Sequence, residues 1–331
     1  MAARLDTPVL GVQDSYAGPN RWQVSTTWRY QRSHRHFVGP NEQTQRADDQ
    51  SEVINNINLA ELGIRYNATP QWSFSLGIPY MIAKRSSPIR DSSRVVVARS
   101  RVESQSVGDI VLSAHRLLFK PLTHPDGNFS FGLGIKAPTG KYDAEDTRLS
   151  LVNGKYVTSV ETVDQSIQPG DGGWGVMLDA QAFQRIRHSG FALYGSASYL
   201  INPRNTNGVP TFRSGLGEGV MSVADQYVAR VGTSYSNKDW KGIGVTFGGR
   251  LEGVPVYDLV GSSDGFRRPG YAISAEPGVS WSHGPHTFSL DVPVAVYRNR
   301  TRSVADRLVP GRHGDAAFAD YIIMLGYWRK Y

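Results

Sequence analysis

The chain has 331 residues, a formal net charge of +7, 40% hydrophobic residues and no cysteine, and its mean hydropathy is −0.36. These values exclude a helical membrane protein, because no apolar run approaches the ~20 residues that a membrane-spanning helix needs. They also exclude a disulfide framework and thiolate chemistry. The charge is modest and spread along the chain, so we expect no nucleic-acid partner. A transmembrane β-barrel stays compatible with the low mean hydropathy, since half of its strand residues face a wet lumen.

Residues 1–20 show no periodicity, and we expect them to form an N-terminal periplasmic leader. The first six residues, Met1 to Asp6, do not resemble a signal peptide. We therefore expect that an export signal has been removed and that Met1 was added for expression. Residues 21–331 are predicted to form a single transmembrane β-barrel domain.

Twelve segments then alternate between apolar and polar residues, which is the two-residue period of a strand with one oily and one wet face. In chain order they cover approximately 22–30, 60–66, 72–82, 108–119, 129–135, 174–180, 191–199, 223–235, 243–251, 271–281, 288–296 and 321–331. The tenth and eleventh segments form a hairpin with arms of ~10 residues, a length that suits a tilted crossing of a bilayer. A further hairpin is predicted around Asn153-Gly154, inside the longest loop.

The connections between these segments alternate in length. Five are short, and each is bracketed by aromatic residues: Tyr66/Trp72, Phe119/Phe129, Phe183/Phe191, Tyr235/Trp240 and Trp281/Phe288. Six are long and polar. This sorting is typical of an outer-membrane barrel, whereas a soluble β-sandwich or propeller predicts neither the sorting nor the aromatic brackets. The fold class is therefore predicted to be all-β: a closed antiparallel transmembrane β-barrel of about 12 strands, with short periplasmic turns, long extracellular loops and both termini on the short-turn side.

Aromatic residues beside the short turns are expected to lie at the membrane interface. The residues predicted for this girdle are Trp22, Tyr66, Trp72, Phe119, Phe129, Tyr235, Trp240, Trp281, Phe288 and Tyr331. The terminal Tyr331 lies where barrel proteins have a final aromatic residue on the lipid face. Arg329, two residues earlier, is charged and does not match this pattern, so we expect its long side chain to extend to the membrane interface.

Polar residues that alternate with the outward ones are expected to face the lumen. The residues predicted to line it are Arg250, Glu276, Asp291, Arg230, Gln226, Asp179, Gln181 and Lys136. Counting the register from the turns puts Arg250 beside Ser274 and diagonal to Glu276, and it puts Asp291 opposite Gly278. Two interpretations stay open for the charges. They line a narrow passage and set its charge preference, or they neutralise each other and brace a filled barrel.

Two prolines fall nearly opposite each other on the tenth and eleventh segments, Pro277 and Pro293. Neither can donate a hydrogen bond to the strand ladder. We therefore predict that pairing is broken there by a bulge.

Several motifs resemble those of enzymes or metal sites and are set aside. The stretch 170–175 has the spacing G-x-G-x-x-G, but a strand rather than a helix follows it. The stretch 134–141 resembles a phosphate-binding loop, yet it has one residue too many and is followed by Tyr142 instead of Ser or Thr. His34 and His36 lie two apart in a polar loop without a nearby third ligand, so no metal site is predicted. A nucleophile elbow is absent, which leaves a hydrolase as a minor alternative.

Three stretches resemble a known family: Gly-Asp-Ile-Val-Leu at 108–112, the segment 131–143 with its Pro-Thr-Gly-Lys core, and Gly-Gly-Trp-Gly at 172–175. They are similar to the outer-membrane proteins grouped under the meta-pathway of phenol degradation. The resemblance covers the fourth to sixth segments and is architectural elsewhere. It implies a barrel for the passage of small, often aromatic, compounds, and it implies no catalytic residues.

The function predicted from these observations is an outer-membrane channel of a Gram-negative bacterium for the passive passage of small solutes, including hydrophobic or aromatic compounds. We expect no enzymatic activity and no cofactor. The alternative is a structural or surface-recognition barrel that binds a partner through its long loops. The expected partners are outer-membrane lipid, a small-molecule solute and the barrel-assembly machinery, while the oligomeric state stays open. A barrel of eight strands is filled by its own side chains, and one of sixteen encloses open water. A barrel of twelve strands is intermediate in width, and we expect a loop or the leader to constrict its lumen.

Overall fold

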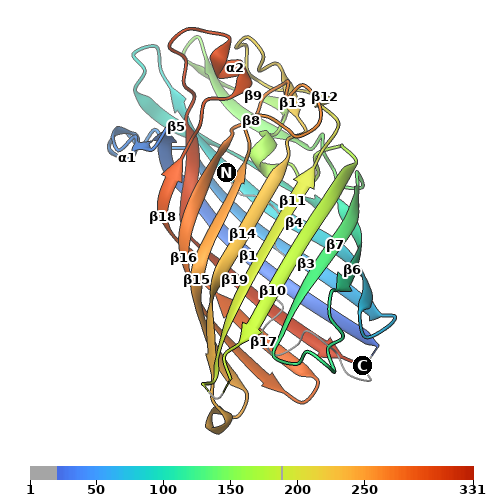
Figure 1. The fold of residues 1–331 in the computed structure, drawn as a ribbon. Coiled ribbons are helices and arrows are strands. Elements are labelled where there is room, and N and C mark those ends of the chain that lie inside the picture. The colour runs from blue at the N-terminus through green and yellow to red at the C-terminus, as the bar shows by residue number, and fades with distance from the viewer. Residues whose placement is uncertain (1–20, 188) are drawn as a thin grey trace.

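The computed structural model describes residues 21–187 and 189–331, so the predicted leader 1–20 lies outside the described residues. Almost all regular structure is β (Figure 1). The helices of the described chain are α1 (Gln45–Asp48), α2 (Val304–Arg307) and the single 3₁₀ turns η1 (Gln165–Ile167) and η2 (Lys238–Trp240). Each of these helices is too short and too polar to cross a membrane.

Twelve consecutive antiparallel wall segments close into a barrel, which confirms the predicted fold class. In chain order the wall contains β1 (Trp22–Val38), β3 (Ile54–Asn67), β4 (Trp72–Arg90), β5 (Val96–Val107) with β6 (Ile110–Leu117), β7 (Gly127–Ala137), β10 (Gly175–Arg185), β11 (Phe191–Ile201), β14 (Gln226–Ser236), β15 (Ile243–Val254), β16 (Gly270–His283), β17 (His286–Asp291) with β18 (Val294–Asn299), and β19 (Ala316–Lys330).

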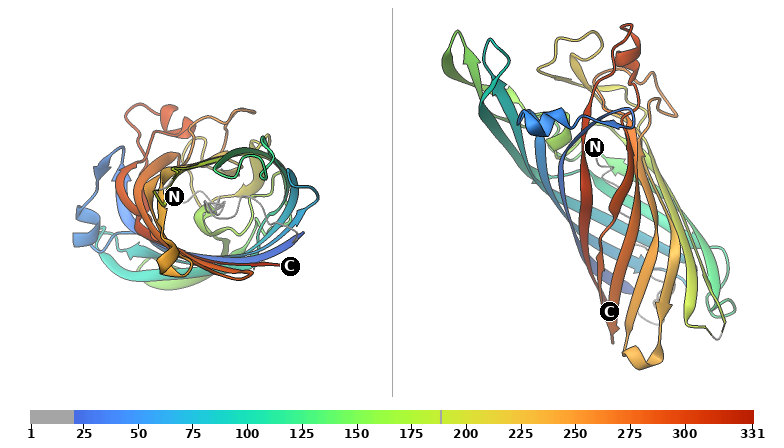
Figure 2. Two further views of the ribbon diagram at one scale, coloured as in Figure 1. Left: turned by 60° about the horizontal axis from the view of Figure 1, so that its bottom comes forward. Right: turned by 90° about the vertical axis from the view of Figure 1, so that its left-hand side faces the viewer.

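The first and last wall strands close the ring (Figure 2). β1 pairs with β19 from Gln23↔Lys330 to Phe37↔Ala316. At the short-turn end the Tyr331 amide donates to the Trp22 carbonyl over 2.9 Å. A closed ring removes the exposed edges that an open sheet would present to lipid.

The two ends of the barrel differ as the connection lengths predict. The tight turns lie at the end where the C-terminus emerges, and the longer connections lie at the opposite end (Figure 1). The β4–β5 connection, residues 91–95, is the exception, because it lies at the loop end but is a tight turn rather than the long loop that was predicted. The long connections contain the short elements β2 (Asn41–Glu42), α1, β8 (Glu145–Val152), β9 (Lys155–Thr162), η1, β12 (Thr206–Pro210), β13 (Val220–Ser222) and α2. The predicted hairpin at Asn153-Gly154 is confirmed as the β8–β9 pair, with positive φ angles of 50° and 76° at the two turn residues.

Several strand boundaries predicted from the sequence are wrong. β1 continues to Val38, so His34 and His36 lie on a strand rather than in a loop. The charged stretch before Gly108 is not a loop either, because it forms β5 and pairs with the outer part of β4. These extensions are polar on both faces, so apolar alternation does not reveal them, although their backbones pair normally. Val223, predicted for the eighth strand, lies in the connection before β14 and is fully buried.

The eleventh wall strand is interrupted, as the prolines predict, but the geometry differs in detail. β17 ends at Asp291 and β18 begins at Val294, with Pro293 in the gap. Pro277 lies across from Val292, whose amide donates to the Pro277 carbonyl over 3.0 Å. The register is the same on both sides of the gap, and the bulge lies further along, beside Ser274. The broken pairing is therefore confirmed, whereas the predicted position of the bulge is wrong.

The wall is apolar outside and polar inside. Along β4, Trp72 and Phe74 expose 42% and 46% of their surface, while the intervening Ser73 is buried. The same alternation runs through the other wall strands, with exposed Leu133 on β7 and Val231 on β14. Phe183, which was grouped with the turn aromatics, has the inward phase of β10 and packs on Ala192 and Tyr194.

Candidate functional site

A network of buried ion pairs covers one side of the lumen. Glu276 of β16 accepts two hydrogen bonds from Arg230 of β14, from Nε over 2.9 Å and from Nη2 over 2.5 Å. Arg250 of β15 donates from Nε to Glu252 over 2.7 Å, and its Nη1 lies 3.9 Å from Glu276. Arg250 and Glu276 each expose only 1% of their surface. Fork-shaped pairing of this kind satisfies both charges and fixes their geometry.

The network also crosses the interior. Arg29 of β1 donates from Nη2 to Glu252 over 3.0 Å. β1 and β15 are not neighbours in the sheet, because β16, β17 with β18, and β19 lie between them. The Arg29–Glu252 pair therefore ties two separated parts of the wall together.

The predicted register of this region is confirmed. Arg250 pairs with Ser274, and Gly278 pairs with Asp291. Asp291 lies at the margin of the network, 3.9 Å from Arg230. Of the predicted lumen residues, the structure thus brings together Arg250, Glu276, Arg230 and Asp291. Arg29 and Glu252, which complete the network, are absent from the predicted set.

Lys136 of β7 lies on another part of the wall, in a cluster of ion pairs and hydrogen bonds that links three connections. Its ammonium group contacts Asp171 and lies 3.7 Å from Asp109. The Asp109 carboxylate accepts hydrogen bonds from the backbone amides of Gly140 and Asp171, each over 3.0 Å. The three stretches of the family resemblance therefore meet at or beside one place, and they hold the segment before β10 against the wall.

Glycine is required where these connections cross. A Cβ added to Gly140 would lie 2.8 Å from the backbone of Gly170, and one added to Gly170 would lie 2.7 Å from Gly140. Such distances leave no room for a side chain. The spacing G-x-G-x-x-G at 170–175 is thus part of a close backbone crossing that leads into the strand β10.

The segment from Val163 to Gly170 folds inward across the lumen and includes η1. Ile167 is fully buried against Met81 and Ala83, two inward residues of β4. The Gln168 side chain accepts from the Ala144 amide over 2.9 Å and donates to the Ala144 carbonyl over 3.1 Å. This inward segment, with η1 within the ring of strands in Figure 2, lies where a loop was expected to constrict the lumen.

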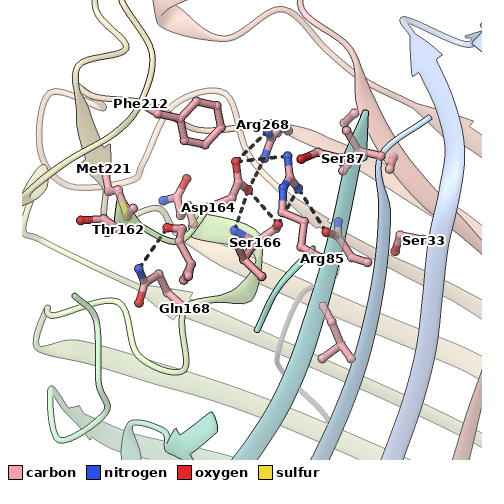
Figure 3. A pocket seen from close by; sticks show the side chains of 18 of the residues that line it. Ser33, Arg85, Ser87, Thr162, Asp164, Ser166, Gln168, Phe212, Met221 and Arg268 are labelled. Atoms are coloured by element: carbon pink, nitrogen blue, oxygen red, sulfur yellow. Dashed lines mark hydrogen bonds and ion pairs between the residues drawn. The ribbon is translucent and has the colours of Figure 1, made fainter. Parts of the chain in front are cut away.

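Asp164, in the inward segment, is surrounded by three arginines from distant parts of the chain (Figure 3). Arg268 binds it through two nitrogens at 2.9 and 3.1 Å, Arg213 through one at 3.2 Å, and Arg85 lies at 3.5 Å. Burial alone raises the pKa of Asp164, but the three guanidinium groups together hold that pKa well below its usual value. Asp164 is therefore a carboxylate at any physiological pH.

Three adjoining cavities lie in the lumen. One of about 950 Å³ lies at the short-turn end, one of about 230 Å³ at mid-height, and one of about 390 Å³ at the loop end beside Asp164. The short-turn cavity and the middle cavity share the lining residues Gln23 and Trp328. The middle cavity and the loop-end cavity share Leu59, Asp171 and Gln226. Arg29 lines both the short-turn and the loop-end cavity, so all three cavities adjoin one another.

The predicted lumen residues divide between these cavities and the ion-pair network. Asp179, Gln181, Gln226 and Lys136 line the middle cavity. Arg230 and Asp291 line the cavity at the short-turn end. Arg250 and Glu276 line none of the three. The cluster of Asp164 with Arg85, Arg213 and Arg268 was missed, because polar loop residues show no period from which contacts follow.

The aromatic residues predicted for the interface lie at the short-turn end and contact one another. Ring centroids are 4.7 Å apart in Trp22–Tyr66, 5.2 Å in Tyr235–Trp240 and 5.7 Å in Trp281–Phe288. The other residues of the predicted girdle, Trp72, Phe119, Phe129 and Tyr331, lie on strand ends or turns at the same end.

A second set of outward aromatic residues, which sequence reasoning missed, lies eight residues further along the strands. The corresponding pairs are Trp22/Tyr30, Trp72/Tyr80, Phe191/Tyr199 and Tyr235/Tyr227. Eight residues span ~26 Å along a strand, or roughly 20 Å along the barrel axis at a tilt of about 40°. The repeated spacing of outward aromatics was the signal that could have revealed this second belt.

Within the described residues, no group of three or more His, Cys, Asp or Glu side chains could hold a metal ion. His36 contacts Asp315 over 2.7 Å, and His34 lies 3.8 Å from Asp320. The two histidines therefore have separate carboxylate partners.

A scan against models of known protein families finds no match, so the likeness to the phenol meta-pathway group stays a resemblance. A search of curated proteins finds no match either. Among solved structures, the COG4313 outer membrane channel from Pseudomonas putida F1 matches with a TM-score of 0.60 at 12% identity, covering 99% of this chain and 100% of that chain. At this identity the match shows a shared fold.

Two further structures match at lower scores. The translocator domain of the autotransporter NalP from Neisseria meningitidis has a TM-score of 0.48 at 10% identity, covering 98% of this chain and 93% of that chain. The toluene transporter TbuX from Ralstonia pickettii has a TM-score of 0.48 at 7% identity, covering 100% of this chain and 96% of that chain. Both are too distant to support an argument.

Proposed function

We propose that this protein is an outer-membrane channel of a Gram-negative bacterium, through which small solutes pass passively along the lumen. The observation that supports the proposal is the inverted polarity of the wall, with buried charges inside and exposed apolar side chains outside. An arginine on the lipid face costs about 2–4 kcal/mol at the bilayer midplane, whereas the same residue in a wet lumen costs little. The two aromatic belts suit the two interfaces of an outer membrane.

The path of the solute follows the three adjoining cavities, from the loop end to the short-turn end. We propose that Asp179, Gln181, Gln226 and Lys136 face this path, since they line the middle cavity. Arg250 and Glu276 act differently. They are 1% exposed and line none of these cavities, so they brace the wall rather than touch the solute.

Further parts of the proposal concern the surroundings of the barrel. The fold neighbour from Pseudomonas putida F1 is itself an outer membrane channel. Outer-membrane lipid would contact the exposed apolar band, and the barrel-assembly machinery would insert the chain. Apolar side chains such as Leu59 and Met81 in the loop-end cavity suit small solutes with a hydrophobic or aromatic part.

The experiment that tests the channel is conductance in planar bilayers, with solute flux into proteoliposomes as a second readout. Adjacent positions on β10 provide a matched pair, because Gln181 faces the middle cavity and Ala180 has the outward phase. Gln181→Trp should lower both conductance and flux, whereas Ala180→Trp should leave them unchanged. A folded wild-type protein without conductance, or equal effects of the two variants, would contradict the proposal.

A second function is favoured by the long connections. Leu216, Tyr257 and Leu259 expose 64%, 57% and 66% of their surface at the loop end. Exposed apolar side chains of this kind are common where a protein binds a partner. A folded, non-conducting barrel would favour this surface-recognition function over the channel.

A further inference from the structure

The loop-end cavity contains an excess of positive charge. Asp164 is the common partner of Arg85, Arg213 and Arg268, so one carboxylate faces three guanidinium groups. The other acids that line this cavity are Glu161, Asp171 and Asp315, and each has a partner of its own. Glu161 pairs with Arg148 over 3.0 Å, Asp315 pairs with Arg46 over 2.6 Å, and Asp171 pairs with Lys136. Within the described residues, the three guanidinium groups therefore exceed the one carboxylate that pairs with them by two formal charges.

These charges are sheltered from water. The Asp164 side chain is fully buried, and the side chains of Arg85, Arg213 and Arg268 expose 8%, 19% and 17%. Buried charge is costly unless it is paired. An anion that enters the cavity would be attracted by the surplus, and a cation would be repelled.

The same cavity has an apolar wall next to the charges. Phe212 lies under the Arg213 guanidinium at 4.4 Å and exposes 46% of its surface. Met221, Val163 and Ile57 also line the cavity. An ion without an apolar part, such as phosphate, would leave this wall in contact with water, whereas an apolar body on the ligand would cover it.

Arg213 contacts both Asp164 and the aromatic wall. Its Nη1 donates to Asp164, and its Cζ lies over the rings of Phe212 and Phe266, at 4.4 and 3.8 Å from their centroids. A stacked guanidinium keeps edge donors for a carboxylate, which it can bind through two parallel hydrogen bonds. The cavity volume of about 390 Å³ is within the range of small-molecule sites.

We propose that the Asp164 cluster and its apolar wall form a binding subsite for small monocarboxylates with an apolar body, placed at the loop-end constriction of the channel. The proposal rests on the proposed function and names the class of solute. A monocarboxylate would neutralise part of the surplus charge and cover the Phe212 wall. A neutral compound of the same shape would gain only the second interaction.

The test uses the purified full-length protein in planar bilayers, with benzoate, benzyl alcohol, acetate and inorganic phosphate as probes. The reversal potential in a KCl gradient should show preference for anions, and benzoate should block the current at lower concentration than any other probe. Arg213→Gln should weaken benzoate blockade about tenfold, the loss expected for one charge-assisted hydrogen bond. Phe212→Ala should weaken benzoate blockade but leave acetate and the reversal potential unchanged.

Lys155→Gln is the control, because it removes one positive charge at the exposed turn of the β8–β9 hairpin, outside the cavity. It should leave benzoate blockade unchanged. Each variant is first checked for folding by its gel mobility without boiling. Equal blockade by benzoate and benzyl alcohol, equal blockade by benzoate and phosphate, or no effect of Arg213→Gln in a folded variant would overturn the proposal.

Calorimetric titration of the detergent-solubilised protein with benzoate separates this proposal from the channel function. Benzoate binding that Arg213→Gln weakens, in a protein without conductance, would support the subsite and contradict the channel. Conductance without benzoate binding or blockade would support the channel and contradict the subsite.

Discussion

At the scale of single residues, the interior depends on carboxylates that each hold more than one arginine. Glu276 is bound by Arg230 and lies 3.9 Å from Arg250. Replacing a whole buried ion pair by apolar residues can be neutral, whereas removing one partner leaves a buried charge without compensation. Glu276 is therefore a residue at which truncation should cost more than the hydrogen bonds it removes.

We expect Glu276→Ala to lower the free energy of unfolding by about 3–5 kcal/mol, because Arg230 loses its hydrogen-bonded counter-ion in a buried site and Arg250 loses a neighbouring carboxylate. The measurement is denaturant unfolding in detergent micelles. The matched control is Glu103→Ala, which breaks the exposed pair of Glu103 with Lys84, whose side chains are 65% and 67% exposed. This control should cost about 0–1 kcal/mol. Similar losses in the two variants would show that the Glu276 network contributes little to stability.

The pH dependence of the constriction follows from the lowered pKa of Asp164. A carboxyl whose folded-state pKa is depressed contributes stability above its ordinary pKa of 3.8 and loses it only as the pH falls through the folded value. Because the folded value lies well below 3.8, we expect Asp164 to cause no conductance step between pH 7 and about pH 4.5. A step near pH 5 that disappears in Asp164→Asn would contradict this assignment.

At the scale of elements, the eleventh wall strand is interrupted. Pro293 offers no amide, and β17 and β18 are separated at this point. The register nevertheless continues unchanged, because the Val292 amide still reaches the Pro277 carbonyl over 3.0 Å. A gap of this kind is local and leaves the neighbouring strands paired.

We expect amides at 292–296 to exchange with solvent faster than those at 74–82, where β4 pairs continuously with β3. Hydrogen exchange read by mass spectrometry in micelles measures the difference. Pro293→Ala restores a donor on the ladder and should slow the exchange of this region. Equal protection of the two regions in the wild-type protein would show that the interruption has no effect on dynamics.

At the scale of the whole molecule, closure between β1 and β19 joins the wall strands into one continuous ring. Their pairing extends along both strands, from Gln23↔Lys330 to Phe37↔Ala316. In lipid, every backbone donor and acceptor of the wall must be satisfied internally, and only a closed ring achieves this. Loss of the last strand would expose two edges at once.

We expect the folded protein to migrate faster without boiling than after boiling in gel electrophoresis, with a circular dichroism spectrum dominated by β-structure. A chain that lacks residues 316–331 should lose the fast-migrating form, because β1 and β17 then have no partner in β19. An unboiled wild-type sample without a mobility shift, or a truncated chain that retains one, would be inconsistent with closure through β19.

Local patterns in the sequence determined the wall. Two-residue alternation identified the strands, and tight turns allowed register to be counted, so that the pairs Arg250↔Ser274 and Gly278↔Asp291 could be predicted. This approach did not identify the polar strands, because a strand such as β5 has no apolar face from which a two-residue period could be recognised. Only the tertiary structure decided which charges meet inside. Arg29 reaches Glu252 across the lumen, and Asp164 meets Arg268, 104 residues away in the chain. Such contacts depend on barrel closure and on inward-folding loops, and neither leaves a periodic trace in the order of residues.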